Sequence, residues 1–253
     1  MKAITGFIVT LGVALSFASP AGAAGDEAHW AYAGKAGADK WGDMKKEFET
    51  CKLGKEQSPI DIKDKQAQKA KLDAIKFDYK PSPLKIIDNG HTIQVNYAPG
   101  SSISVNGSQY ELLQFHFHKP SEEKINGKAY AMVAHLVHKN KEDKLAVVGV
   151  LLDKGKENAV LKTLWSNFPK AKEKEVAPDK VSIDAASFLP ADRNYYTFNG
   201  SLTTPPCSEG VTWFVLKNPV QAAKGQFDAF GKLYAMNARP VQPLNSRVIK
   251  SSN

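Results

Sequence analysis

Leu113-Gln114-Phe115-His116-Phe117-His118-Lys119-Pro120 is a β-strand sequence whose two faces differ in chemistry. Because side chains alternate along a strand, Gln114, His116 and His118 lie on one face and the two phenylalanines on the other. Imidazoles two residues apart are about 7 Å apart, so they can converge on one ion while the phenylalanines anchor the strand. A third imidazole, His135, lies in a second strand-like run. Three neutral imidazoles with an open fourth position suit a catalytic zinc. For a His-x-His pair alone, a surface or core role is the alternative.

The first residues have the features of a secretory signal peptide. Met1-Lys2 gives a positive start, residues 4–17 form an apolar run, and small residues ending at Ala23 fit a cleavage site. We expect removal of residues 1–23 and a mature domain over 24–253. The alternative, an uncleaved anchor, is disfavoured because a spanning helix needs about 20 apolar residues. The sequence predicts a periplasmic or secreted protein with no membrane insertion after cleavage.

The cysteine content fits an exported protein. The chain has two cysteines, Cys51 and Cys207. An even number in an oxidising compartment favours one disulfide between them, here closing a long loop.

The charge balance is basic, with a formal net charge of +8 and a pI of about 9.2. However, the lysines are scattered or occur in mixed-charge runs, and no run interleaves arginine with aromatic residues. We therefore expect a solvated surface and no nucleic-acid partner.

Alternating apolar residues and turn dipeptides dominate from residue 75 onward. Turns between strand-like runs are marked by Asn89-Gly90, Asn106-Gly107 and Asn126-Gly127. Residues 145–152 are apolar throughout, which suits a strand buried on both faces. Helical spacing of apolar residues occurs at 157–168 and 222–233. We predict a β-dominated α+β fold of one domain, with a large central mixed, mainly antiparallel sheet and short peripheral helices.

Several motifs occur in the order found in alpha-class carbonic anhydrases, and the chain resembles the bacterial, exported branch of that family. The motifs are QSPIDI at 57–62, NGH at 89–91, QFHFH at 114–118, SE at 121–122, HLVH at 135–138, GSLTTPP at 200–206, VTW at 211–213 and NARPVQPL at 237–244. The resemblance runs from residue 29 to residue 247. It implies a lyase that reversibly hydrates CO₂ to bicarbonate and a proton.

The resemblance also implies roles for the residues around the metal. It implies a zinc held by His116, His118 and His135, with hydroxide in the fourth position. Zinc lowers the pKa of its water to about 7, which gives a nucleophile at neutral pH. Thr203 would accept the hydroxide's hydrogen and donate its own to Glu122, because a carboxylate can only accept.

The remaining histidines divide by position. His91 follows the Asn89-Gly90 turn and occupies the family's proton-shuttle position, which suits an imidazole with a pKa near 6.5. The alternative for His91 is an ordinary surface histidine. His138 lies an odd number of residues from His135, so we expect it on the opposite strand face in a structural role. His29 receives no role.

By the same correspondence, an apolar wall would hold CO₂, and Thr204 also belongs to the substrate site. The wall residues are Val137, Val147, Leu202, Val211 and Trp213. Without the family, each of them is an ordinary core residue. The expected partners are CO₂, water and bicarbonate, with weak hydrolysis of activated esters as a side activity. A homodimer is left open.

One position departs from the family pattern. Metal-bound histidines usually donate their second N–H to an acceptor. The resemblance gives this role to the Gln114 side chain for the first histidine and to the Asn237 carbonyl for the second. The third acceptor is normally a glutamate two residues before His135, where this chain has Val133. The N–H must then bond to water, another side chain or nothing.

We therefore predict a functional zinc site that is weaker or slower than the family norm. The competing hypothesis is a catalytically silent relative that uses the same fold as a binding or structural module. Such relatives usually lack a zinc histidine, whereas all three are present here.

Overall fold

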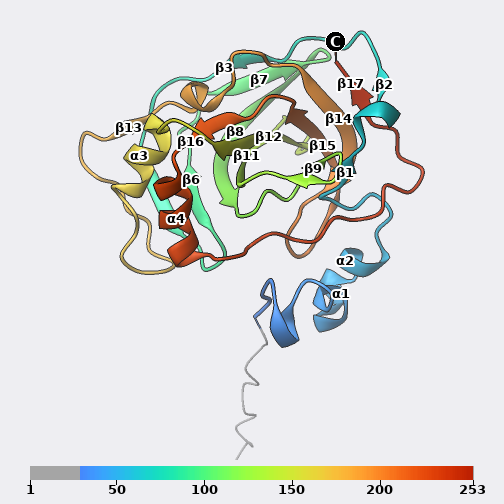
Figure 1. The fold of residues 1–253 in the computed structure, drawn as a ribbon, viewed down its shortest axis with the longest axis horizontal. Helices are drawn as coiled ribbons and strands as arrows, with labels where there is room; N and C mark the ends of the chain where they lie inside the picture. The colour runs from blue at the N-terminus through green and yellow to red at the C-terminus, as the bar shows by residue number, and fades with distance from the viewer. Residues whose placement is uncertain (1–28, 253) are drawn as a thin grey trace, which may run out of the picture.

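The computed structural model describes residues 29–252, whose fold is shown in Figure 1. The expected signal peptide, residues 1–23, lies outside the described residues and stays a prediction. None of the described helices is long and apolar enough to cross a bilayer.

A twelve-stranded sheet forms the centre of the described chain (Figure 1). Its main path in space is β2 (Gln68–Lys69), β17 (Lys250–Ser251), β14 (Tyr195–Ser201), β15 (Glu209–Leu216), β12 (Leu145–Lys154), β11 (Met132–Lys139), β8 (Ser108–His118), β6 (Ile93–Asn96) and β5 (Lys85–Asp88). Off this path lie β3 (Lys76–Asp78), β7 (Ser102–Val105) and β16 (Val220–Ala222). The β2–β17, β12–β15 and β12–β16 pairs are parallel. The other pairs are antiparallel, so the predicted mixed, mainly antiparallel sheet is confirmed.

Two small sheets and several short helices surround the central sheet. The small sheets consist of β1 (Asp61–Ile62), β9 (Lys124–Ile125) and β10 (Lys128–Ala129), and of β4 (Ser82–Pro83) and β13 (Ser182–Ile183). The α-helices are α1 (Trp41–Met44), α2 (Thr50–Leu53), α3 (Ala159–Trp165) and α4 (Lys224–Leu233). Four 3₁₀ turns are η1 (Gly34–Ala36), η2 (Lys46–Phe48), η3 (Asp64–Gln66) and η4 (Ala185–Phe188).

The two longer helices are shorter than predicted. The helix expected over 157–168 begins after Asn158, whose side chain accepts a hydrogen bond from the Leu161 N–H and caps the first turn. The helix expected from residue 222 begins at Lys224, because Ala222 is still paired in β16 with Lys154 of β12. Sheet pairing therefore competes with helical spacing at that end.

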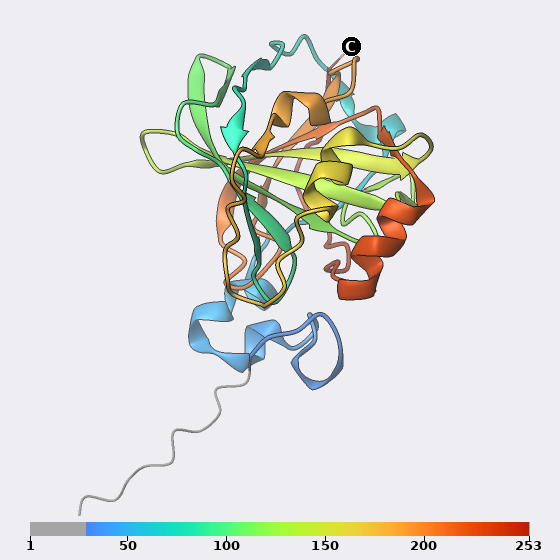
Figure 2. The same ribbon diagram turned by 90° about the vertical axis from the view of Figure 1, so that its left-hand side faces the viewer.

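Strand β8 separates the core from the candidate site. Its Phe115 and Phe117 join the larger of the two main core clusters. The Phe117 ring lies 5.2 Å from the Trp165 ring of α3 and 6.3 Å from the Phe230 ring of α4, measured between centroids. Figure 2 shows α3 and α4 together on one side of the sheet. The phenylalanines thus anchor the strand as predicted, and the face that carries the histidines points the other way.

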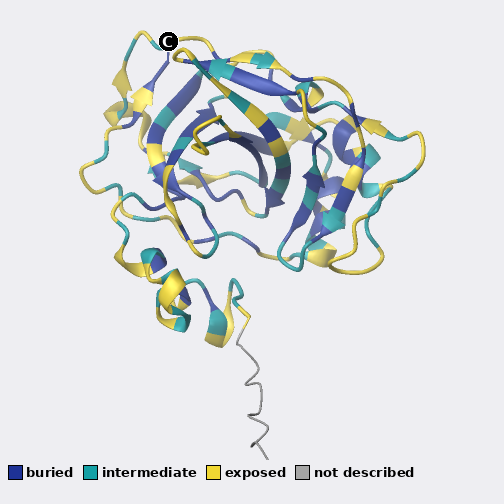
Figure 3. Cartoon of the chain, turned by 180° about the vertical axis from the view of Figure 1, so that it is seen from behind, coloured by how far each residue is buried: buried dark blue, intermediate teal, exposed yellow. Residues whose placement is uncertain are grey.

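The other sheet face carries a second apolar cluster that continues across three strands. Val137 of β11 pairs with Val147 of β12, and Val147 pairs with Trp213 of β15. All three belong to this second cluster. Residues 146–152 of β12 are buried in succession, which confirms the strand buried on both faces. Figure 3 shows buried residues concentrated in these central strands.

The N-terminal segment packs beside the sheet through aromatic residues and one covalent bond. Trp41 is fully buried, and its indole N–H donates to the Ala31 carbonyl at 2.8 Å. Cys51 of α2 forms a disulfide with Cys207, 156 residues later and beyond the end of β14. The predicted disulfide is therefore confirmed.

Candidate metal centre

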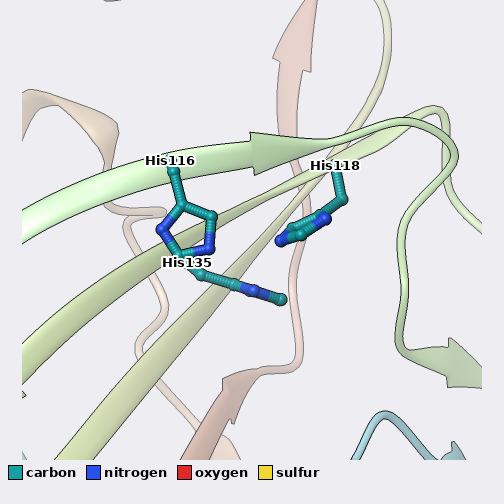
Figure 4. Close-up of side chains that lie close together, drawn as sticks. All are labelled: His116, His118 and His135. Atoms are coloured by element: carbon teal, nitrogen blue, oxygen red, sulfur yellow. The ribbon is translucent and has the colours of Figure 1, made fainter. Parts of the chain in front are cut away.

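Three histidines meet on the face of the sheet that the phenylalanines leave free. Strands β8 and β11 are antiparallel, and their register sets His135 directly opposite His116. His118 is two residues further along β8, so its ring projects from the same face. One ring nitrogen of each histidine lies within 4.8 Å of the others. Figure 4 shows the rings of His116 and His118 leaving one strand and facing His135 from the next.

Hydrogen-bond acceptors fix the tautomers of the two β8 histidines. His118 Nδ1 lies 2.8 Å from the Asn237 carbonyl oxygen, which can only accept, so Nδ1 carries the proton. His116 Nδ1 lies 2.8 Å from Gln114 Oε1, with the same consequence. Both Nε2 lone pairs are therefore free, and His118 Nε2 is buried with no hydrogen-bond partner. The Gln114 side chain and the Asn237 carbonyl thus lie where the family resemblance implies them.

The third histidine has an acceptor that the sequence did not identify. His135 Nε2 lies 3.1 Å from Glu123 Oε2, and the Glu123 side chain is completely buried. A carboxylate accepts, so Nε2 carries the proton and Nδ1 presents its lone pair. Val133 is itself fully buried in the apolar cluster. Of the options left open for His135, another side chain is the one observed, and this removes the reason to expect a weaker site. The available signal was a second acidic residue directly after Glu122.

Glu122 is buried beside two of the histidines, His118 and His135. Its Oε1 accepts a 2.7 Å hydrogen bond from the Arg239 backbone N–H and lies 3.4 Å from His118 Nδ1. Burial raises the pKa of the Glu122 carboxyl, and the neighbouring Thr203 hydroxyl is among the groups that oppose this rise. Among the described residues Glu122 Oε2 has no hydrogen-bond partner, so the Thr203 hydroxyl lies near the carboxylate without a hydrogen bond of normal geometry. The structure thus brings together the predicted pair.

Burial and the two carboxylates set the electrostatics of the cluster. Burial lowers the pKa of His116 to about 3 and that of His118 well below its ordinary value. Burial also lowers the pKa of His135, but the Glu123 and Glu122 carboxylates outweigh it and raise that pKa. Burial raises the pKa of Glu122 to about 7, against the opposing effect of His135. Metals bind neutral imidazoles, and a divalent cation would compensate the buried carboxylates.

The predicted apolar wall lies against the third histidine. The Trp213 and His135 ring centroids are 4.9 Å apart at an interplanar angle of 80°. Trp213 shares its apolar cluster with Val137, Val147 and Val211, and the partly buried Leu202 packs against them. The sheet register therefore assembles one continuous wall. Thr204, half-buried, follows Thr203 in the chain.

His91 lies in what we call the N-terminal stack, formed by His29, Trp30 and His91. The Trp30 and His91 rings are parallel, with centroids 3.5 Å apart, and His29 Nε2 lies 2.8 Å from His91 Nε2. Burial, assisted by the charge of His29, lowers the pKa of His91 to about 4. This differs from the expected imidazole near pKa 6.5, because Trp30 and His29 cover the ring. His29, left without a role, is a member of this stack.

Tyr32 links the N-terminal stack to the three clustered histidines. Its ring centroid lies 6.5 Å from that of His91 and 6.5 Å from that of His118. Asn237 makes a second link, since its side-chain amide donates to the His91 carbonyl while its own carbonyl accepts from His118. The turn that bears His91 is thus tied to the cluster through one buried asparagine.

His138 lies apart from the cluster. It is fully buried, and its Nε2 lies 2.7 Å from the Tyr79 hydroxyl. Its Nδ1 has no hydrogen-bond partner among the described residues, so the ring is only half satisfied. His138 belongs to the packing between strands, as the odd spacing from His135 predicted.

The chain is similar in sequence to a family of known proteins. The family described as eukaryotic-type carbonic anhydrase matches residues 36–253. A carbonic anhydrase of Neisseria gonorrhoeae is 44% identical over 235 residues, which cover 90% of this chain and 90% of that protein.

Solved structures agree with the sequence relatives. A hyperthermostable carbonic anhydrase from a hydrothermal vent chimney aligns with a TM-score of 0.85 at 46% identity, covering 89% of this chain and 100% of that one. The alpha-carbonic anhydrase of Thermovibrio ammonificans, solved with the inhibitor sulfanilamide, has a TM-score of 0.85 at 43% identity, covering 89% and 99%. The similarity therefore extends over nearly all of the described residues.

Proposed function

Since this chain belongs to the eukaryotic-type, or alpha, carbonic anhydrase family, whose enzymes hydrate CO₂, we propose that it does so with a zinc ion held by His116, His118 and His135. The observation that carries the proposal is the convergence of three imidazole nitrogens within 4.8 Å of one another. Three imidazoles are the ligand set that leaves zinc one open position.

The residues fit a zinc ion in protonation as well as in number. The acceptors on Gln114, Asn237 and Glu123 hold the proton of each ring on the nitrogen away from the cluster. The buried His118 Nε2 has no other partner to satisfy it. A bound zinc ion would supply a nucleophile at neutral pH, because it lowers the pKa of its water to about 7.

Thr203 and Glu122 would orient the reacting group. The Glu122 carboxylate accepts from the Arg239 backbone, which leaves its other oxygen available to a donor. If the Thr203 hydroxyl donates to that oxygen, its own lone pairs are left to accept a hydrogen bond. Thr203 would then select a reacting group that can donate, and the selection depends on a buried carboxylate that stays an acceptor.

The apolar wall would hold CO₂ beside the cluster. The side chains of Val137, Val147 and Trp213 are buried, and the Trp213 indole N–H is their only hydrogen-bonding group. That N–H donates to the Ser201 carbonyl at 3.1 Å, so it is occupied. A surface of this kind favours an apolar substrate over water.

His91 would carry the product proton towards solvent. In the N-terminal stack its pKa is about 4, which is too low for efficient exchange near neutral pH. We therefore propose that His91 relays protons when its ring leaves Trp30, which would restore a pKa closer to 6.5.

Removal and return of zinc tests the proposal. The rate of CO₂ hydration, measured by stopped flow, should fall to the uncatalysed rate in buffer alone after treatment with a chelator. It should return when one equivalent of zinc is added. Equal rates before and after verified zinc removal would overturn it. Weak hydrolysis of an activated ester should follow the same pattern.

The place of action is also part of the proposal. The Cys51–Cys207 disulfide is compatible with an oxidising compartment. We propose export to the periplasm or the medium after cleavage behind Ala23. Sequencing of the mature N-terminus should begin at residue 24, and a mature chain that retains Met1 would contradict this.

A further inference from the structure

We propose that Glu123 is the positioning residue for the third zinc ligand and replaces the acceptor that is missing at Val133. The inference rests on the proposed zinc function. Val133 lies two residues before His135 on the same strand face but cannot accept a hydrogen bond. The Glu123 carboxylate reaches the same ring from a different element, the loop between β8 and β9.

The distances around His135 indicate which of its ring nitrogens carries the proton. Glu123 Oε2 is 3.1 Å from Nε2, within hydrogen-bond distance, whereas Glu122 Oε2 is 3.9 Å from Nδ1, beyond it. The Nε2 proton is therefore used by Glu123, and the Nδ1 lone pair faces the other histidines. In contrast, the two β8 histidines present Nε2.

The backbone of Glu123 is fixed on both sides. The Ser121 hydroxyl donates to the Glu123 carbonyl at 2.8 Å and accepts from the Tyr130 N–H at 2.8 Å. The next residue, Lys124, donates its N–H to the Ile60 carbonyl at 3.2 Å and begins β9. These hydrogen bonds hold the loop in place, as a residue that orients a ligand ring requires.

The surroundings of Glu123 also point towards a cation. The side chain is completely buried, and its Oε1 has no hydrogen-bond partner among the described residues. A buried carboxylate whose second oxygen has no partner is costly unless positive charge lies near it. Zinc bound to His135 would provide that charge through the ring, and the carboxylate would in turn make the imidazole a more basic ligand.

Substitution of Glu123 should weaken zinc binding. Glu123→Leu removes the acceptor, and we expect zinc affinity, measured by competition with a chelator such as dipicolinate, to fall about 10–100-fold. Glu123→Gln keeps an acceptor of the same size without the charge, so its loss should be smaller. Glu142→Gln, an exposed carboxylate in another loop, is the matched control and should leave the affinity unchanged.

An exchange of positions distinguishes orientation of the ligand from a merely structural role. The double variant Glu123→Val with Val133→Glu moves the carboxylate to the strand, and it should recover most of the zinc affinity lost by Glu123→Leu. Val133→Glu alone should bring no gain, because His135 already has an acceptor. Unchanged affinity in Glu123→Leu, or tighter zinc binding in Val133→Glu alone, would overturn the inference.

A measurement on the unaltered protein covers the case in which the variants fail to fold. Nitrogen-15 NMR of the zinc-loaded protein should show the His135 proton on Nε2 and protected from exchange. A proton on Nδ1, or rapid exchange at Nε2, would overturn the inference even if the variants cannot be prepared. Failure of the wild-type chain to bind zinc would instead refute the proposed function, so the two failures are distinguishable.

Discussion

The group of His116, His118 and His135 and the N-terminal stack both contain histidines, but they hold them in different ways. In the cluster, each ring is oriented by an oxygen acceptor from β8, from the loop after β8 or from the Asn237 backbone. In the stack, the His91 ring lies parallel to the Trp30 ring, and its Nε2 atom contacts Nε2 of the exposed His29. The cluster is thus organised to keep its rings in place, whereas the stack depends on contacts that side-chain rotation can break.

The difference corresponds to two chemical requirements. A metal ligand must present a lone pair in a fixed direction, so a directional acceptor behind the ring is useful. A proton carrier must exchange with solvent and titrate near the working pH. The comparison predicts that changes in the cluster act on metal binding and chemistry, whereas changes in the stack act on proton transfer alone.

Loss of a zinc ligand should have the largest effect. His135→Ala removes the ligand that joins β11 to the cluster, and we expect CO₂ hydration to fall by more than about 100-fold, beyond the usual loss for an outer-shell partner. Stopped flow with parallel zinc analysis checks this. His138→Ala alters a buried histidine of the same strand outside the cluster and should retain zinc. Equal zinc loss in both variants would contradict the assignment.

Changes at Thr203 should affect the chemistry but leave the metal in place. Thr203→Ala removes the hydroxyl beside Glu122, and we expect kcat/KM for hydration to fall about 100-fold, as for loss of an orienting group in other enzymes. Zinc content should stay at the wild-type value. Thr163→Ala on α3, which packs with the core on the other sheet face, serves as the control. A Thr203→Ala enzyme with normal kcat/KM would remove Thr203 from the mechanism.

Removal of His91 should have a smaller effect that depends on buffer. His91→Ala should lower kcat severalfold in weak buffer, because proton transfer to solvent loses its carrier. Added imidazole should restore the rate, and kcat/KM should change little. Unaltered turnover in weak buffer would mean that His91 is not the shuttle.

Release of His91 from the stack should change its titration. Because burial is the main cause that lowers the pKa of His91 to about 4, Trp30→Ala should raise that pKa towards 6.5. A larger fraction of His91 is then protonated at neutral pH. NMR titration can follow this, with His138, whose pKa burial lowers to about 3, as an internal reference. If the pKa of His91 stays near 4, Trp30 does not control it.

The same contrast explains what could be predicted from the sequence. Strand alternation places His116 and His118 on one face, and the family motif order adds His135, so the group of three histidines could be predicted. Glu123 could not, because its approach to His135 depends on the path of the loop after β8 and on contacts with Ser121. The stacking of His91 was also unpredicted, since it depends on how an N-terminal segment with no regular strand or long helix packs.

Metal content and CO₂ hydration, measured on one preparation of the oxidised, signal-free protein, test whether the three histidines hold a catalytic zinc ion. We expect about one zinc per chain, because the described residues form a single three-histidine site. We also expect rapid hydration that a sulfonamide inhibits. Zinc without hydration would contradict the roles of Thr203, Glu122 and the apolar wall. A properly folded chain that binds no zinc would contradict the proposed function as a whole.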